Sequence, residues 1–310
     1  MAALGGHVWT IAPDLLDRVW PARAPADMPW SIDVADARFG VVRIGGRIRV
    51  VEGSDTLLVV VHGLGGSSES PYVRRAAIAA LAHGWSCLRI DLRGADGRGE
   101  DYYHAGLSSD LQAALVEPRC ALHRRVLVLG YSLGGHIALR LALDPGDPRV
   151  RGVAAVCAPL DLARSAAWID QRRSWLYRSH VLRGLVGNYR AVAARRELPV
   201  TLAEVARVRT IREWDRLAVV PRHGFTDVDD YYARASVGPR LRELAVPSAW
   251  FGARHDPMVP EPTVSLALAQ AGDALHVRWI ERGGHVGFPR DAEQGGTLEA
   301  AVLRWLADQG

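Results

Sequence analysis

The sequence contains no lysine, so every one of its 38 basic residues is an arginine. These arginines are interspersed with 34 acidic residues, and the formal net charge is only +4. No dense basic run is present of the kind that follows a nucleic-acid backbone. We therefore expect no nucleic-acid partner.

Cysteine is scarce, and the long apolar runs of membrane proteins are missing. Cys87, Cys120 and Cys157 are an odd number without C-x-x-C spacing, which argues against a disulfide framework and a zinc site. No stretch approaches roughly eighteen consecutive apolar residues, and no basic segment leads an apolar one at the amino terminus. We therefore expect a soluble, cytoplasmic protein.

The most informative stretch that is present covers residues 126–143 and reads VLVLGYSLGGHIALRLAL. Its first four residues are typical of a fully buried strand, and a helical pattern begins after Ser132. Between them lies G-x-S-x-G, a sharp turn that makes a strained serine project from the carboxyl edge of a sheet. We therefore predict that Ser132 is a nucleophile and that the N–H of Leu133 donates to an oxyanion.

A second buried strand, residues 57–61, leads directly into the glycine-rich loop His62-Gly63-Leu64-Gly65-Gly66. The Lys-Ser/Thr pair of a phosphate-binding loop does not follow these glycines. A loop in this place can instead supply the other half of an oxyanion hole, and we assign that donor to the N–H of Leu64. His62 fits a residue that braces the loop better than it fits a base.

Two later strands each end in a turn that carries a chemically useful side chain. Asp256 follows the strand at 248–251, and His285 follows the strand at 277–280. Because the carboxyl ends of parallel strands share one edge of an open sheet, Ser132, Asp256 and His285 can meet there. The chain order Ser, Asp, His is that of α/β-hydrolases and differs from the chymotrypsin and subtilisin orders.

Other polar side chains at the same edge leave alternatives open. Asp161 follows the strand at 153–157 and is the reserve acid. Asp91 and Arg93 could line the site, although a buried aspartate–arginine brace for a loop is the simpler interpretation. The role of His104 is left open.

Strands and helices alternate along the chain, which predicts an α/β fold with a mostly parallel central sheet flanked by helices. Residues 159–247 interrupt this alternation with helical character over a length too great for a simple crossover. We therefore divide the chain into core 1–158 with an amino-terminal arm, helical cap 159–247 and core 248–310. Residues 39–51 resemble one or two antiparallel edge strands joined by a glycine turn.

The predicted cap is rich in arginine and contains tryptophan. From Asp161 to Arg216 there are twelve arginines and six acids. Trp168 and Trp175, together with Tyr131 beside the nucleophile, are our candidates for contacts with a substrate. A basic cap with tryptophans could make weak contact with an anionic lipid surface, although an ordinary solvated helix exterior is the simpler interpretation.

Several segments together resemble the YheT-like family of the α/β-hydrolase superfamily. They are HGLGGSSESPY from His62, GYSLGGH around Ser132, TIREWDRLAVVPRHGFTDVDDYYARAS in the cap, and GGHVGF around His285. The resemblance covers nearly the whole chain. It implies hydrolysis of short- to medium-chain acyl esters or of phospholipids, or acyl transfer to an alcohol, with no cofactor. Trp9 and His136 stand where the family usually has glutamine and asparagine.

The residues and the resemblance together predict a serine carboxylesterase without a metal. His285, oriented by Asp256, would take the proton of Ser132 as its oxygen attacks an ester, and water would then release the acyl group. Serine at the turn excludes a dehalogenase, which needs aspartate there. An acyltransferase would use the same residues, and a binding protein would usually lack one. We expect a small-molecule or lipid-like ester substrate; its acyl and alcohol parts and the oligomeric state stay open.

Overall fold

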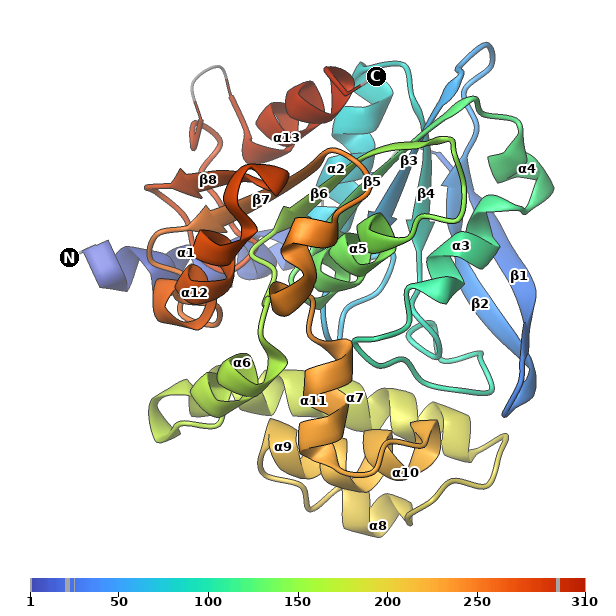
Figure 1. Ribbon diagram of the computed structural model, residues 1–310, viewed down its shortest axis with the longest axis vertical. Coiled ribbons are helices and arrows are strands. Elements are labelled where there is room, and N and C mark those ends of the chain that lie inside the picture. Colours follow the sequence, from blue (N-terminus) through green and yellow to red (C-terminus); the bar gives the residue numbers. More distant parts are fainter. Residues whose placement is uncertain (1, 20–22, 25, 294–295, 310) are drawn as a thin grey trace.

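The computed structural model describes residues 2–19, 23–24, 26–293 and 296–309 (Figure 1). Its centre is an eight-stranded sheet in the order β1-β2-β4-β3-β5-β6-β7-β8. β1 and β2 pair antiparallel, β2 also pairs antiparallel with β4, and all other neighbours in the sheet are parallel. The prediction of a mostly parallel α/β sheet is therefore confirmed.

The bounds of the elements follow. The strands are β1 Met28–Asp36, β2 Gly40–Arg49, β3 Thr56–Val61, β4 Ser86–Ile90, β5 Arg125–Tyr131, β6 Val150–Val156, β7 Ser248–Ala253 and β8 His276–Ile280. The helices outside the segment between β6 and β7 are α1 Ala2–Val19, α2 Pro71–Ala82, α3 Ser109–Leu115, α4 Pro118–Ala121, α5 Leu133–Leu143, α12 Glu261–Ala271, the 3-10 helix η4 Gly272–Ala274 and α13 Leu298–Ala307. Between β6 and β7 lie α6 Leu162–Ile169, η1 Arg172–Ser174, α7 Trp175–Ala193, α8 Leu202–Val205, α9 Ile211–Trp214, the π-helix η2 Asp215–Val219, α10 Val220–His223, α11 Val228–Ala235 and the 3-10 helix η3 Gly238–Glu243.

The central strands are apolar along their whole length because helices cover both faces of the sheet. Every residue of β3 and β7 is buried. Successive side chains of β3 point to opposite faces: Leu58 and Val60 join a core with α2 and α13, whereas Leu57 and Val59 join a core with α3, α5 and α12. This double burial fixes the strand register and so fixes where each strand ends.

The antiparallel edge differs in detail from the prediction. The hairpin is formed by β1 and β2, and its turn at residues 37–39 is followed by Gly40, with φ 74°, rather than lying at Gly45-Gly46. Both glycines lie inside β2. A Cβ on Gly46 would stand 2.6 Å from the carbonyl oxygen of Arg89 on the neighbouring strand, so close packing explains this glycine better than a turn does.

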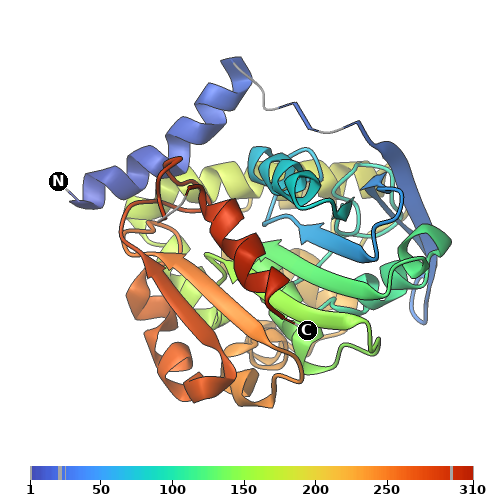
Figure 2. The ribbon, with the colours of Figure 1, turned by 90° about the horizontal axis from the view of Figure 1, so that it is seen from above.

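The amino-terminal segment, which we predicted to be an arm, forms helix α1. Figure 2 shows this helix lying across the outside of the body. Gly6, Thr10 and Asp17 share the face that meets the body, where Asp17 forms an ion pair with Arg74 of α2. No helix in the described part of the chain is both long and apolar enough to cross a bilayer.

The helices between β6 and β7 form a separate layer at one edge of the sheet, which we call the cap (Figure 1). This layer ends with α11, because η3 returns to the core and packs against α12. A Cβ on Gly238 would lie 2.9 Å from the carbonyl oxygen of Leu160 and 3.0 Å from Ala267 of α12. The helices that stand away from the core therefore end before residue 247, the boundary that we predicted.

Several polar contacts attach the cap to the core, and two side chains are central to them. The ring nitrogens of His136, in α5, lie 2.9 Å and 2.8 Å from the carbonyl oxygens of Pro159 and Ala235, at the beginning and end of the cap. Burial lowers the pKa of His136 to about 4, so the imidazole is neutral at neutral pH. Asp101 of the core, fully buried, pairs with Arg222 of α10 at 3.0 Å.

Candidate active site

Ser132 lies between β5 and α5 in a conformation that L-residues rarely adopt, with φ 51° and ψ −124°. The glycines on either side of the turn make it possible. A Cβ on Gly130 would lie 2.2 Å from the carbonyl oxygen of Gly134, and a Cβ on Gly134 would lie 2.3 Å from the carbonyl oxygen of His62. The turn that the G-x-S-x-G pattern predicted is therefore present.

Ser132, His285 and Asp256 form a continuous chain of hydrogen-bonding groups. The Nε2 atom of His285 lies 2.8 Å from the Ser132 hydroxyl oxygen, and its Nδ1 atom lies 2.9 Å from Oδ2 of Asp256. The other carboxyl oxygen of Asp256 accepts the backbone N–H groups of Met258 at 2.7 Å and Val259 at 2.9 Å. Three hydrogen bonds therefore fix this buried carboxylate, and one of them orients the imidazole of His285.

The electrostatics of this chain suit a base. Burial works to raise the pKa of Asp256, but the adjacent imidazole and the two backbone N–H groups outweigh it and hold the pKa below the ordinary value. The carboxylate therefore stays charged at neutral pH and accepts an Nδ1–H of His285. In that tautomer Nε2 presents its lone pair to the Ser132 hydroxyl.

The loop that carries His285 is held by a residue that the sequence gave us no reason to single out. The backbone N–H of His285 donates to the Thr10 hydroxyl of α1 at 2.8 Å. Val286, the next residue, has φ 52°, so the loop is strained where it places the imidazole. The Thr10 hydroxyl in turn donates to the carbonyl oxygen of Gly6 at 2.7 Å. Helix α1 is therefore part of the support of the site.

Two backbone N–H groups beside Ser132 remain available for an oxyanion. In the loop after β3, the N–H of Gly63 donates to the hydroxyl of Tyr72 at 3.0 Å, and that of Gly65 donates to the hydroxyl of Tyr103 at 2.7 Å. Leu64 lies between them and, like Leu133 at the start of α5, lines the same cavity as Ser132. Within the described residues neither leucine N–H has a recorded acceptor.

His62 contacts the backbone on both sides of its ring and does not contact Ser132. Its Nδ1 atom lies 2.7 Å from the carbonyl oxygen of Gly63, and its Nε2 atom accepts the N–H of Leu92 at 3.0 Å. Burial is the main cause that lowers the pKa of His62, which keeps the ring neutral. These are the contacts of a residue that braces the loop.

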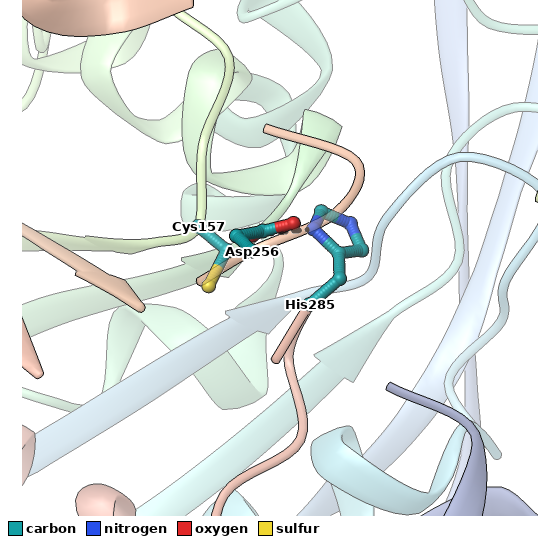
Figure 3. Close-up of side chains that lie close together, drawn as sticks. All are labelled: Cys157, Asp256 and His285. Carbon is teal, nitrogen blue, oxygen red and sulfur yellow. Dashed lines mark hydrogen bonds and ion pairs between the residues drawn. The ribbon is translucent and has the colours of Figure 1, made fainter. Parts of the chain in front are cut away.

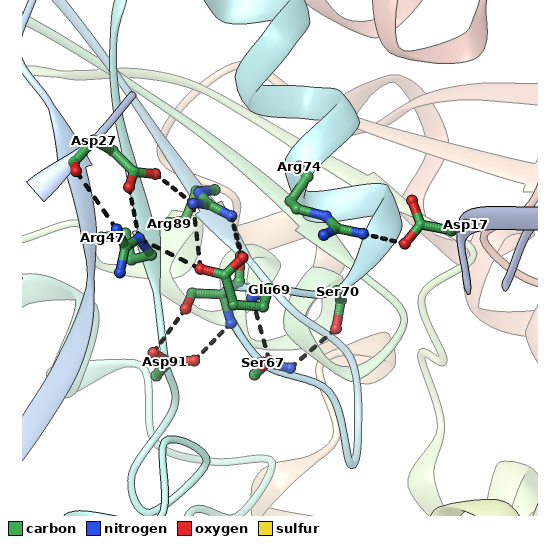
Figure 4. Close-up of polar contacts among 10 residues, drawn as sticks. Asp17, Asp27, Arg47, Ser67, Glu69, Ser70, Arg74, Arg89 and Asp91 are labelled. Atoms are coloured by element: carbon green, nitrogen blue, oxygen red, sulfur yellow. Dashed lines mark hydrogen bonds and ion pairs between the residues drawn. The ribbon is translucent and has the colours of Figure 1, made fainter. Parts of the chain in front are cut away.

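A polar network fastens the rest of the same loop to the sheet (Figure 4). Asp91, which follows β4, accepts the backbone N–H of Ser68 at 2.6 Å and its hydroxyl at 2.9 Å. Arg89 donates to the carbonyl oxygen of Ser68 at 2.6 Å and pairs with Asp27. Each of these groups is at least largely buried, so the loop that carries Leu64 has little freedom to move.

Arg93 does not pair with Asp91, the partner that we expected. It makes a bidentate contact with Asp110, with both nitrogen–oxygen distances 2.7 Å, and it also reaches Asp36 at 2.7 Å and Asp101 at 3.0 Å. The brace exists, but it lies outside the cavity, because Asp91 is turned toward the loop at Ser68 and Arg93 toward β1 and α3.

The cavity beside Ser132 has a volume of about 410 Å³. Core and cap both contribute to its wall, which is mainly apolar. Its apolar members include Leu64, Leu162, Ile169, Leu176, Val181 and Val219. A cavity of this kind can hold the acyl chain of an ester next to the serine.

The three aromatic residues that we proposed for substrate contact do not line this cavity. Tyr131 is buried on the opposite face of the sheet, where its ring packs against Tyr72. The indole N–H of Trp168 donates to the carbonyl oxygen of Pro257 at 3.0 Å, and the ring is covered by Arg173. Trp175 is 60% exposed. None of the three is therefore placed to contact a substrate in this cavity.

Residues close to these aromatic positions line the cavity instead, because the direction of a side chain depends on its exact position along a strand or helix. Tyr131 is the last residue of β5 and points to the face of the sheet opposite the cavity, whereas Ser132 lies in the turn that follows the strand. On helix α7, Leu176, Tyr177 and Val181 line the cavity, and the one-residue offset turns Trp175 toward solvent. A single sequence does not reveal which helical face meets the core.

Two other candidates of the sequence have structural surroundings. Asp161, the reserve acid, caps α6 by accepting the N–H of Arg164 at 2.9 Å. His104 lines the cavity, but its Nδ1 atom accepts the N–H of Gly106 at 3.0 Å. Burial is the main cause that lowers the pKa of His104 well below its ordinary value. Neither side chain has a recorded contact with Ser132.

Cys157, Asp256 and His285 place one ligand-type atom each within 4.8 Å of one another (Figure 3). Metal binding would compete with the Asp256–His285 hydrogen bond. It would also require a thiolate, whereas burial raises the pKa of the Cys157 thiol well above its ordinary value. The chemistry of these three side chains therefore fits the hydrogen-bonded chain better than a metal site.

This combination of sheet, turn and hydrogen-bonded side chains defines a class of protein. Residues 56–291 match the family model described as alpha/beta hydrolase fold, and the chain belongs to that superfamily. Within it, the chain is 33% identical to YheT of Escherichia coli (strain K12) over 267 residues, which cover 80% of this chain and 76% of that protein. The resemblance to the YheT-like family is thereby confirmed.

More distant relatives agree. The chain is 26% identical over 258 residues to the monoacylglycerol lipase of Saccharomyces cerevisiae, covering 76% of this chain and 55% of that protein. A crystal structure of a hydrolase from Pseudomonas aeruginosa aligns with a TM-score of 0.55 and 21% identity, covering 89% of this chain and 98% of that chain. The structural likeness is one of fold.

Proposed function

We propose that this protein is a serine carboxylesterase that hydrolyses short- to medium-chain acyl esters. The observation that carries the proposal is the unbroken chain from the Ser132 hydroxyl through His285 to Asp256, with contacts of 2.8 Å and 2.9 Å. Ser132 lines an apolar cavity together with Leu64 and Leu133, whose backbone N–H groups have no recorded acceptor among the described residues. The relatives of esterase and lipase type support the same class of reaction.

The mechanism follows from these positions. Nε2 of His285 takes the Ser132 proton as the hydroxyl oxygen attacks the ester carbonyl, and the N–H groups of Leu64 and Leu133 donate to the developing oxyanion. The imidazolium then gives its proton to the departing alcohol, which leaves an acyl-enzyme. Water, deprotonated by the same imidazole, attacks the acyl carbonyl and releases the acid and the free serine. Asp256 orients the imidazole throughout and stabilises its positive charge.

We also propose that the enzyme makes weak contact with an anionic lipid surface while it takes up its substrate. The outer face of α1 carries exposed apolar side chains, which are Val8, Ile11, Leu15, Leu16 and Val19. Ile11 and Leu15 also line the cavity, so this row of exposed apolar side chains extends from the cavity onto the outer surface of α1. Across from it, the segment from Asp170 to Glu197 contains no acid between its ends and exposes Arg172, Arg173 and Arg183. Apolar residues flanked by arginines suit an interfacial site.

The experiment that tests the esterase is hydrolysis of p-nitrophenyl esters of increasing acyl length by the parent and by Ser132→Ala. We expect turnover that peaks at one acyl length and falls on the order of 10³-fold or more in the variant, because the three side chains act as a unit. A fluorophosphonate should label the parent at Ser132 and leave the variant unlabelled.

A folded parent that neither turns over any ester nor reacts with the fluorophosphonate would overturn the proposal and favour a binding protein on this fold. Repeating the assay with added alcohol separates hydrolysis from transfer. If the acyl group passes to the alcohol in preference to water, the enzyme is an acyltransferase that uses the same residues.

A further inference from the structure

The cap wall of the cavity contains one buried carboxyl group that the proposed mechanism does not use. Asp215 lines the cavity and is only 7% exposed. Among the described lining residues it is the only acidic side chain. A carboxyl group placed in a mainly apolar wall costs free energy unless something compensates for it, so its position calls for a partner.

The backbone at Asp215 is unusual as well. Asp215 begins the π-helical segment η2, which separates α9 from α10. A π-helical turn inserts extra backbone into an α-helix, re-aims its side chains and is frequent at functional sites. Here Trp214, Asp215 and Val219 all line the cavity, and the carbonyl oxygen of Ala218 accepts the hydroxyl of Tyr102 at 2.7 Å.

Among the described residues, this carboxyl group has one recorded hydrogen bond and no recorded ion pair. Tyr232 of α11, which also lines the cavity, donates its hydroxyl proton to Oδ2 of Asp215 at 2.6 Å. Arg212 is committed to Asp229 at 2.9 Å and 2.8 Å. No partner for the other carboxyl oxygen of Asp215 is recorded among the residues that the structure describes.

The neighbouring charges do not neutralise Asp215 either. Asp170 accepts the backbone N–H groups of Ile211 at 2.7 Å and Arg212 at 3.1 Å, and its negative charge opposes ionisation of Asp215. Burial is the main cause that raises the pKa of Asp215 to about 7, against the lowering effects of Tyr232 and Arg212. The group can therefore serve as a hydrogen-bond acceptor without a full buried charge.

Most other polar groups of the wall already have partners. The Tyr103 hydroxyl accepts the N–H of Gly65, and the Tyr231 hydroxyl accepts the N–H of Ala105 at 3.0 Å. The free acceptor on Asp215 is thus a specific feature of the cap. An ammonium group would favour a fully ionised acid, whereas a neutral hydroxyl fits a carboxyl group whose ionisation is opposed by its surroundings.

We propose that Asp215 and Tyr232 form a polar subsite in the cap that receives a hydroxyl group of the ester substrate. The substrate hydroxyl donates to the free oxygen of Asp215, while Tyr232 holds the carboxyl group in place. The inference rests on the proposed esterase function and narrows its substrates to hydroxylated esters. The remainder of the acyl or alcohol chain then lies along the apolar wall.

The test uses matched pairs of esters that differ by one hydroxyl. One pair has the same acyl chain on glycerol or on propanol, and the other has a hydroxyl on the acyl chain or lacks it. The measurement is the ratio of kcat/KM for the hydroxylated ester to that for its plain partner. We expect a ratio of about ten or more in the parent for at least one pair. A substrate hydroxyl can donate to the free oxygen of Asp215, whereas the plain ester leaves this buried oxygen without a partner.

Three variants then test whether this preference depends on Asp215 and Tyr232. Asp215→Leu and the double variant Asp215→Leu/Tyr232→Phe should bring that ratio close to one, and the double variant leaves no unpaired phenol behind. Tyr232→Phe alone should lower the ratio less, and it serves if Asp215→Leu fails to fold. The matched control is Glu197→Gln, an exposed cap acid outside the cavity, which should leave the ratio at the parent value.

The outcomes separate this inference from the function on which it rests. A parent that hydrolyses both members of each pair with a ratio near one overturns the subsite and leaves the esterase standing. A clear preference that survives in Asp215→Leu also overturns it, because the hydroxyl is then recognised elsewhere. A parent that hydrolyses none of the esters overturns both proposals.

Discussion

The sheet and the cap of this protein are built in opposite ways. The central strands are buried on both faces, and the ends of β5, β7 and β8 deliver Ser132, Asp256 and His285 at hydrogen-bonding distance. The cap consists of mostly short helices, carries many exposed arginines and is interrupted by a π-helical turn. Rigid strand ends suit chemistry that needs fixed geometry, whereas the cap shapes what reaches the serine.

The comparison also shows that one element belongs to neither region. Helix α1 contacts the cap through His7, whose Nδ1 atom lies 2.6 Å from the hydroxyl of Tyr177, and it supports the core through the contact between Thr10 and His285. A change at α1 can therefore affect both chemistry and access. The following predictions separate these contributions, beginning with the largest expected effect.

Substitutions of the hydrogen-bonded side chains His285 and Asp256 should lower the activity more than any other change. We expect His285→Ala and Asp256→Asn each to lower kcat by about 10³-fold or more while the protein stays folded, because the base or its orientation is lost. The measurement is steady-state hydrolysis together with thermal unfolding. His276→Ala, at the exposed start of β8, is the matched histidine control. Near-parent kcat in His285→Ala would show that another group serves as the base.

The buried ion pairs of Arg93 should contribute to the stability of the core, and a substitution of this arginine tests that contribution. Replacing it by Met leaves the buried Asp110 with an uncompensated charge and leaves Asp101 with Arg222 alone, and we expect a loss of about 3–5 kcal/mol in the free energy of unfolding. Denaturant titration measures the change. Arg43→Met, which breaks an exposed pair with Asp33, is the control and should change stability little. Equal small effects of both substitutions would mean that the buried network is not a brace.

Asp215 gives the cap a contribution to stability that depends on pH. Its pKa is about 7 in the folded protein against an ordinary value of 3.8, so the native state retains a proton that the unfolded chain releases. The free energy of unfolding should therefore fall as the pH rises from about 4 to about 7, by at most about 4 kcal/mol, and the contribution should level off above that range.

The measurement is denaturant unfolding of the parent and of Asp215→Asn at pH 5 and pH 8. Asparagine cannot ionise, so the variant should lose less stability than the parent between these two pH values. Parallel loss in both proteins would show that Asp215 titrates normally and that its surroundings do not resist the charge.

The smallest effect is expected at the surface of α1. Replacing Leu15 and Leu16 by Ser should weaken binding to vesicles that contain anionic lipid by about tenfold, because two exposed apolar side chains no longer enter the interface. Sedimentation with vesicles measures this, and raised salt should weaken the arginine contribution. Equal vesicle binding by parent and variant, or a parent that forms dimers through this face, would contradict the lipid contact.

The sequence alone determined the parts of this protein that depend on local conformation. The apolar runs predicted the central strands, and glycines at fixed spacing predicted the turn at Ser132, because strand, turn and helix patterns involve residues that are close along the chain. Asp256 and His285 could also be selected, since parallel strands bring their carboxyl ends to one edge. The same logic placed Leu64 in the loop after β3.

Only the tertiary structure decided which side chains from distant segments meet. Thr10 supports His285 across 275 positions of the chain, and Asp215 joins Tyr232 from a different helix of the cap. No periodicity reveals such contacts, because it shows that a helix has an apolar face and does not show what that face meets. For the same reason Trp175 was selected, although its neighbour Leu176 is the residue that lines the cavity.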